Sequence, residues 1–198
     1  MAAANLAAAQ EYTNLALDKP TSQSQTAHGG ASSRAVDGNT NGNWGGNSVT
    51  HTPENAANPW WEVDLQGSYE ISKINLFGRT DCCSKHLRGV VVTILNGEEE
   101  VWSYIHSNQT PPNKLELDVE DSDTDTDFVI GSKVRVSLTP RGTISLAEVE
   151  VLQLISTSTS QSPADENFRK KHDLLVGALH NSYIEFDTSN LNMDGSKP

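Results

Sequence analysis

From residue 14 to residue 152 the chain consists of short apolar or alternating runs, each separated from the next by turn-forming residues. Such runs are typical of β-strands, because successive side chains of a strand point to opposite faces of its sheet. No stretch in this part has the apolar spacing of an amphipathic helix of useful length. We expect strands at residues 60–65, 69–77, 90–95, 100–106, 114–119, 133–138 and 146–152. Short strands at this spacing predict an all-β protein, a β-sandwich of the jelly-roll kind.

Turn formers mark a hairpin and a long loop region. Asn96-Gly97 lies between two predicted strands, and both residues tolerate the positive φ of a tight hairpin turn. Residues 28–59 are crowded with Gly and Asn, as in Asp37-Gly38-Asn39 and Gly45-Gly46-Asn47. A long loop in a compact domain is usually either functional or disordered.

The composition changes along the chain and predicts four segments. We expect a flexible N-terminal segment at 1–13, one domain at 14–153, a polar linker at 154–162 and a tail at 163–198. The tail should hold one helix, with Ser162 as its cap and Pro163 in its first turn. Its role is left open by the sequence.

The charge balance excludes two classes of partner. With 14 basic and 26 acidic residues, the formal net charge is -12, which opposes binding to nucleic acid or to anionic lipid surfaces. No run of apolar residues is long enough for membrane insertion. The N-terminal MAAANLAAAQ lacks a basic region and a sustained apolar region, so no signal peptide is visible.

Two adjacent cysteines, Cys82 and Cys83, leave three states open. They could be free thiols, half of a metal site, or a disulfide between neighbours. Adjacent Cα atoms lie about 3.8 Å apart, which is closer than in ordinary disulfides. On chemistry alone, free thiols are favoured.

The same loop, residues 78–89, gathers unusual chemistry. Four cationic or potentially cationic side chains stand beside a single acid in the run Arg79-Thr80-Asp81-Cys82-Cys83-Ser84-Lys85-His86-Leu87-Arg88. A sugar site needs fixed donors for hydroxyl oxygens, an acid to orient them and an apolar face for the ring. The plain alternative is a surface loop whose Arg79–Asp81 pair contributes little.

His51 followed by Arg79-Thr80-Asp81 and a basic stretch resembles the signature of the F-type, or fucose-binding, lectin family. Further stretches resemble family landmarks in the right order: Arg34-Ala35-Val36-Asp37-Gly38-Asn39, Ser48-Val49-Thr50-His51-Thr52, Asn58-Pro59-Trp60-Trp61-Glu62-Val63-Asp64-Leu65 and Leu146-Ala147-Glu148-Val149. The resemblance covers essentially the whole predicted sandwich. It implies a discoidin-like fold that binds terminal α-L-fucose of fucosylated glycans through loops at one end.

The resemblance also implies roles for single residues. His51 and Arg79 would hydrogen-bond the ring oxygen and axial 4-hydroxyl of fucose, and Asp81 would orient Arg79. Cys82 and Cys83 would form a disulfide against the apolar edge of the sugar, which reverses the preference for free thiols. Trp44 would lie near the fucose methyl group.

One position departs from the family pattern. His86 stands where the family has Arg or Lys, and imidazole is shorter and mostly neutral at pH 7. We expect weaker, pH-dependent or altered sugar binding.

A structural calcium ion is implied as well. The resemblance gives it carboxylates from Asp37 and Glu148 and further oxygens from four residues: Arg34, Asn39, Ser48 and Ala147. Oxygen ligands from several loops suit Ca²⁺. Without the resemblance, Asp37-Gly38-Asn39 reads as a simple turn.

We weigh three function classes. The first is a lectin that breaks no bond. The second, a glycosidase, needs paired carboxylates, but the candidate acids cluster at 118–127 or at the calcium positions. The third is a discoidin-like adhesion module binding protein or lipid, which would present apolar or basic loop tips. We therefore predict a lectin and no enzyme, extracellular or in the secretory pathway, where a homo-oligomer would raise avidity.

Overall fold

The computed structural model describes residues 10–107, 109, 112–121 and 126–155. Their strands are β1 (Glu11–Asn14), β2 (Thr21–Gln23), β3 (Ala56–Ala57), β4 (Trp60–Ile71), β5 (Lys73–Gly78), β6 (Val91–Asn96), β7 (Glu99–Ile105), β8 (Lys114–Asp118), β9 (Val129–Ser137), β10 (Arg141–Gly142) and β11 (Leu146–Ile155). Three short 3₁₀ helices lie in the loops: η1 (Ser32–Val36), η2 (Trp44–Gly46) and η3 (Ser84–Leu87). The predicted helix of the tail lies outside the described residues.

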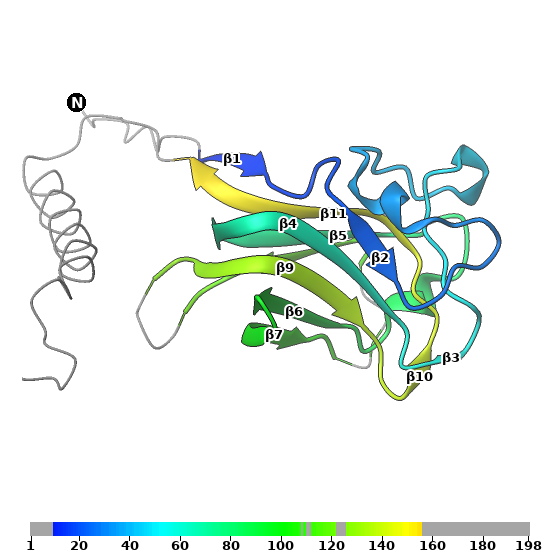
Figure 1. Cartoon of the computed structure of the whole chain (residues 1–198). Coiled ribbons are helices and arrows are strands. Elements are labelled where there is room, and N and C mark those ends of the chain that lie inside the picture. Colours follow the sequence, from blue (N-terminus) through cyan, green and yellow to red (C-terminus); the bar gives the residue numbers. More distant parts are fainter. Residues whose placement is uncertain (1–9, 108, 110–111, 122–125, 156–198) are drawn as a thin grey trace, which may run out of the picture. The chain divides into compact units, whose positions relative to one another are not determined.

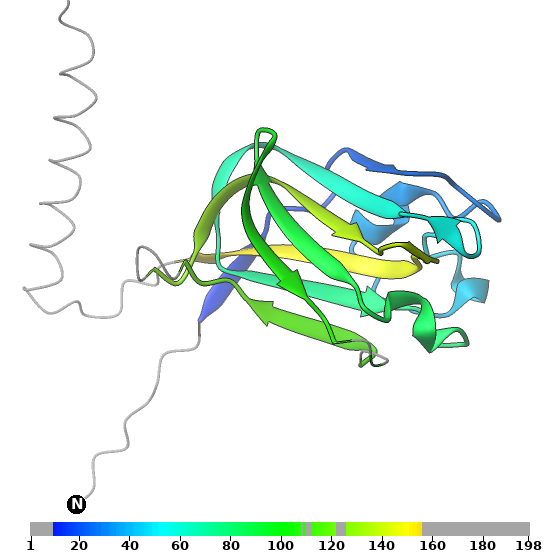
Figure 2. The same ribbon diagram turned by 90° about the horizontal axis from the view of Figure 1, so that it is seen from below.

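Two antiparallel sheets form the body of the domain (Figures 1 and 2). One has the strand order β1-β11-β5-β8 and the other β2-β4-β9-β6-β7, while β10 and β3 form a small separate pair. Neighbouring strands in a sheet are mostly distant in sequence, as in β5 beside β11. The two antiparallel sheets confirm the predicted all-β sandwich.

The core lies between the sheets and is made of the inward side chains of their strands. Burial alternates along β4, where Trp61, Val63 and Leu65 are buried and their neighbours are not. The indole Nε1 of Trp61 donates a hydrogen bond of 2.9 Å to the carbonyl of Ser32, so η1 is fastened to the core. Trp60 faces outward, against the guanidinium of Arg135. This period of two is what a sheet with one buried face requires.

The strand predicted at 69–77 is wrong, because it joins parts of two strands. β4 ends at Ile71 in one sheet and β5 begins at Lys73 in the other, so the chain crosses between the sheets at Ser72. Ile71 and Ile74, three residues apart, are therefore both fully buried. In one continuous strand they would point to opposite faces.

The boundaries of the domain also differ from the prediction. β1 pairs residue by residue with the end of β11, from Glu11 opposite Ile155 to Asn14 opposite Leu152. Residues 11–13 are thus part of a sheet and not of a flexible segment, and residues 154–155 continue β11. The hairpin predicted at Asn96-Gly97 is confirmed, since Asn96 pairs with Glu99 and Gly97 has φ 65°.

Loops from both sheets converge at one end of the sandwich, on the right in Figure 1. η1, η2, η3 and the β3–β10 pair all lie there. The part of the chain that the structure describes contains no helix long and apolar enough to cross a membrane. This loop end is where the predicted sugar-site residues gather.

Candidate functional site

A series of side-chain-to-backbone hydrogen bonds shapes the loop at residues 37–45, which we call the first loop. Asp37, Asn39, Asn41 and Asn43 each accept, through a side-chain oxygen, from the backbone N–H two residues further on. Asp and Asn favour this turn because their short side chains reach the backbone of the next residues. An Asp or Asn at every second position from 37 to 43 therefore determines the fold of this loop. The loop in turn positions Trp44 in the site.

Arg79 follows directly after the last residue of β5 and is held by Asp81. Its Nε donates to Oδ1 of Asp81 at 2.7 Å, and its Nη2 donates to Oδ2 at 3.1 Å. Hydrogen bonds from Arg79, and then from the backbone of Trp44, lower the pKa of Asp81 to about 2. The guanidinium carbon lies 5.0 Å from the ring centroid of Trp44. Arg79 is thus fixed as a planar cation between a carboxylate and an indole.

His51 is buried at the centre of this end, with 3% of its surface exposed. Its Nδ1 lies 2.5 Å from the carbonyl oxygen of Thr52. Because a carbonyl can only accept, Nδ1 carries a proton, and Nε2 of the neutral ring is an acceptor. Burial lowers the pKa of His51 below its usual 6.5. The neutral ring is therefore the stable form at neutral pH.

Three rings surround His51 edge to face. The centroids of His28, Trp44 and His86 lie 5.1, 5.5 and 5.5 Å from that of His51. An open hollow with a volume of about 420 Å³ is lined by His28, Trp44, His51, Glu54 and Arg79. A single sugar ring fits a hollow of this kind, with aromatic walls and a few fixed polar groups.

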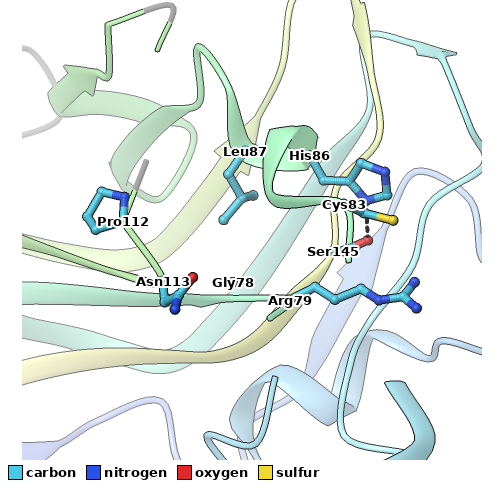
Figure 3. A pocket seen from close by; sticks show the side chains of 8 residues that line it. All are labelled: Gly78, Arg79, Cys83, His86, Leu87, Pro112, Asn113 and Ser145. Carbon is cyan, nitrogen blue, oxygen red and sulfur yellow. Dashed lines mark hydrogen bonds between the residues drawn. The ribbon is translucent and has the colours of Figure 1, made fainter. Parts of the chain in front are cut away.

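His86 enters from η3 on the other side of His51. Its Nδ1 lies 2.9 Å from the hydroxyl oxygen of Ser145, as Figure 3 shows. Burial, and then the nearby His51 and Arg79, lower the pKa of His86. Its ring shares a narrow pocket with Arg79 and Cys83 (Figure 3). Here the departure from the family pattern places a neutral imidazole beside the guanidinium.

Cys82 and Cys83 are bonded to each other, with an S–S distance of 2.06 Å. The free thiols favoured by cysteine chemistry alone are therefore wrong, and the disulfide implied by the resemblance is present. Cys83 takes a left-handed conformation, φ 62°, immediately before η3. The paired cysteines thus turn the chain between Arg79 and His86.

The structure brings most of the predicted sugar-site residues together. Trp44, His51 and Arg79 line one hollow, Cys83 and His86 continue from it, and Asp81 supports Arg79 from behind. Cys82 is exposed and lines neither pocket. The sequence did not predict Glu54 and Ser145 as site residues. Nothing in the sequence around either one distinguishes it from other polar loop residues.

The predicted metal residues belong to η1, to the loop that follows it, to the segment after η2 and to β11. Glu148 is fully buried; its Oε1 accepts from the N–H of Gly38 at 3.2 Å, and its Oε2 has no hydrogen-bond partner among the described residues. Burial, and then the nearby carboxylate of Asp37, raise the pKa of Glu148 to about 7. A buried carboxylate oxygen without a hydrogen-bond partner is costly, and a divalent cation would compensate it.

The other predicted ligands differ in how well they fit. Ser48 and Ala147 are both buried. The hydroxyl of Ser48 donates a hydrogen bond to the carbonyl of Asn41. The side chain of Arg34 instead binds the carbonyl of Val49 at 3.1 Å and the side chain of Asn47, which leaves its backbone carbonyl as the predicted ligand. Among the described residues no group of three or more His, Cys, Asp or Glu could hold a metal. A cation here would rely on two carboxylates and on backbone and hydroxyl oxygens, the donor set that Ca²⁺ accepts.

Comparison with known proteins places these features in context. Residues 34–136 match the family model described as a NedA-like, galactose-binding domain of the F5/F8 type C kind. Fucolectin-4 of Anguilla japonica is 33% identical over 127 residues, which are 62% of this chain and 67% of that protein.

Two solved structures have the same fold at similar identity. The lectin domain of lectinolysin, complexed with Lewis B antigen, is 35% identical with a TM-score of 0.63, covering 74% of this chain and 98% of that one. A Streptococcus pneumoniae fucose binding module, SpX-3, is 36% identical with a TM-score of 0.63, covering 74% and 99%.

Proposed function

Because the chain belongs to the F-type lectin family, a family of carbohydrate-binding proteins without catalytic activity, we propose that it binds terminal L-fucose of fucosylated glycans. The observation that carries this proposal is the fixed Arg79 guanidinium beside the buried, neutral ring of His51 in one open hollow. The names of the similar eel, lectinolysin and pneumococcal proteins support the same sugar.

The donors and acceptors of the hollow match the polar edge of fucose. A guanidinium has five N–H groups, and Asp81 takes one from Nε and one from Nη2. Three N–H groups are therefore left to donate to the ring oxygen and the 4-hydroxyl oxygen. Nε2 of His51 accepts the proton of the 4-hydroxyl, since Nδ1 is occupied by Thr52. An axial 4-hydroxyl lets both residues reach it from one side.

The apolar part of fucose is recognised separately. L-Fucose carries a methyl group where galactose carries a hydroxymethyl group, and we place this methyl against the half-exposed indole of Trp44. Burial of one methyl group contributes about 1 kcal/mol. Cys83 of the disulfide lines the adjoining narrow pocket with Arg79 and His86. Specificity thus arises from one polar and one apolar contact surface.

Isothermal titration with L-fucose and D-galactose tests the proposal. We expect saturable binding of L-fucose and an affinity loss of about 100-fold in Arg79→Gln, since charge-assisted hydrogen bonds contribute about 1.5–3 kcal/mol each. Arg135→Gln is the matched control, because Arg135 also pairs with a carboxylate, Glu62, and lies 5.2 Å from a tryptophan ring, but on the sheet. Equal binding by Arg79→Gln and wild type, or no fucose binding by the folded protein, would refute the proposal.

We further propose that a calcium ion holds the loops behind the hollow. Asp37 and Glu148 would supply carboxylates, and Ser48 with the backbone of Arg34, Asn39 and Ala147 would supply the other oxygens. The unpartnered Oε2 of Glu148 supports this proposal. When bound, the ion would neutralise the buried charge and pin the loop that leads to Trp44 and His51.

We also propose an extracellular or secretory location, which the disulfide supports, because disulfides persist in oxidising compartments.

A further inference from the structure

A second, larger hollow adjoins the proposed fucose site. It has a volume of about 740 Å³, and its lining runs from η3 to the segment before and after β10. His86 lines both this hollow and the narrow pocket that contains Arg79. Asn55 lines it as well, next in sequence to Glu54 of the first hollow. The two hollows are therefore neighbours, with His86 between them.

The second hollow is basic. Lys85, Arg88 and Arg141 line it, and no Asp or Glu is among its lining residues. All three cations are exposed. Within the described residues none of them has an ion-pair partner, whereas Lys73, Lys114 and Lys133 each pair with an acid.

This charge distribution is unusual for the chain as a whole, whose formal net charge is -12. Three uncompensated cations around one concave surface create a local positive potential, because their fields add in the hollow and no carboxylate of its wall offsets them. A negatively charged ligand group would be attracted here and repelled by most of the remaining surface.

The other lining groups suit a sugar rather than a free ion. Ile105 is 72% exposed and offers an apolar surface beside the cations. Asn55 and Thr139 add exposed polar side chains. The hollow is also larger than the one we assign to fucose. Its size and mixed lining therefore fit a second saccharide unit that carries an anionic group.

We propose that this basic hollow is a second subsite, which binds an anionic group, a sulfate ester or a carboxylate, on another sugar of the same fucosylated glycan. The inference rests on the proposed fucose site, because the second hollow is placed beside it by His86, whose ring lies 5.5 Å from that of His51. Arg88 and Arg141 donate hydrogen bonds to the anionic oxygens, as guanidinium groups do for carboxylates and phosphates. The lectin would thus prefer acidic fucosylated glycans over neutral ones.

Titration of the whole chain with a matched set of glycans tests this subsite. The probes are L-fucose, neutral Lewis a trisaccharide, and the same trisaccharide carrying either a 3′-sulfate ester or a 3′-sialic acid. We expect at least one acidic form to bind about three- to tenfold more tightly than the neutral form, since each exposed charge pair contributes modestly. The preference should shrink as salt is raised.

Paired variants locate the effect. Arg88→Gln with Arg141→Gln should remove the preference for the acidic glycan and leave L-fucose affinity unchanged. Lys133→Gln with Arg135→Gln changes the net charge equally on the sheet surface, away from the hollow, and should keep the preference. A gain for the sulfate alone identifies a sulfate ester as the ligand group, and a gain for sialic acid alone identifies a carboxylate.

Two results would overturn the inference. One is equal affinity for neutral and acidic glycans; the other is a preference that survives Arg88→Gln with Arg141→Gln. Failure of L-fucose itself to bind is a different outcome, since it refutes the proposed fucose site. If the sulfated and sialylated glycans then also fail to bind, both proposals are wrong.

Discussion

At the scale of single residues, the site depends on side chains whose orientation and protonation are fixed by hydrogen bonds within the protein. Asp81 occupies two N–H groups of Arg79, and the carbonyl of Thr52 occupies Nδ1 of His51. The remaining N–H groups of Arg79 and the lone pair on Nε2 of His51 are left available to a ligand. Fixing these groups in advance reduces the entropy lost when the ligand binds.

Sugar binding should weaken in acid, because both histidines of the site must be neutral. The pKa values of His51 and His86 lie below the usual 6.5, so affinity should be constant from about pH 8 to about 6.5. At lower pH, protonation removes the acceptor on His51 and adds charge beside Arg79. For each of the two histidines, the loss of fucose affinity should approach tenfold per pH unit below the pKa of that ring in the folded protein. Titration calorimetry with L-fucose measures it.

The same shifts affect stability with a definite sign. A histidine whose pKa is lower in the folded state leaves more protons on the unfolded chain in acid, so stability is lost as pH falls below 6.5. The Arg79–Asp81 pair is unaffected in this range, since the pKa of Asp81 is about 2.

The variant His86→Gln separates the contributions of the two rings to the pH dependence of fucose affinity. A fall in affinity in acid that persists in this variant belongs to His51. Fucose affinity that does not fall as pH is lowered through the pKa of His51, followed by NMR titration of its ring, would contradict the assignment.

Residue patterns were sufficient to predict Trp44, His51, Arg79 and His86 as neighbours, because the family signature records their order. They could not predict Ser145, which meets His86 across a sequence separation of 59 residues. Nor could they predict the basic hollow, since Arg88 and Arg141 come together through the strand order. Such contacts depend on the fold.

At the scale of elements, His51 is positioned by a backbone contact with Gly30. A Cβ atom at Gly30 would lie 2.5 Å from the backbone N of His51 and 2.8 Å from its Cβ. Because the obstructing atoms are mainly backbone, Gly30→Ala should displace the His51 segment. We expect a loss of about 1–3 kcal/mol in unfolding free energy and several-fold weaker fucose binding, measured by thermal melting and calorimetry.

The neighbouring Gly29→Ala provides the control. Gly29 has φ 71° and no atom within 4 Å of an added Cβ, so its substitution strains the backbone without touching His51. It should lower stability by about 1 kcal/mol and keep fucose affinity. Wild-type affinity in Gly30→Ala would show that this contact does not position the ring.

The alternating pattern predicted the long strands better than the short ones. β6, β7 and β8 match their predicted positions closely, because each has five or more residues; in β8 the burial alternates at every position. β2, β3 and β10 have three residues or fewer and show no period. The break at Ser72 was missed although the sequence marks it: Ser72 and Lys73 are consecutive polar residues, so the alternation changes phase where the chain changes sheets.

At the scale of the whole molecule, a metal ion would couple the stability of the loop end to pH. In the metal-free protein, the pKa of Glu148 is about 7, above its unfolded value of 4.5. The folded state then binds more protons in this window, so metal-free stability should fall as pH rises from 4.5 through 7. Calcium binds the deprotonated carboxylate and should reverse this trend.

Melting temperatures with calcium and with a chelator, from about pH 5.5 to about pH 8, check this expectation. The increase caused by calcium should grow with pH and should vanish in Glu148→Gln. Glu150→Gln, two residues further along β11 and bonded to Asn75, should keep the response. Identical melting with and without calcium at pH 8 would refute the metal site.

The pairing of β1 with β11 has a consequence for how the domain can be presented. Glu11 lies opposite Ile155, whereas the other end of β11, at Leu146, lies opposite Gly78 beside the proposed site. Ten residues of strand separate these ends, about 30 Å. Glu11 and Ile155 thus lie at the end of the sandwich opposite the proposed site (Figure 1). A sensor chip, bead or fusion partner attached at that end would leave the proposed sugar-binding face pointing outward.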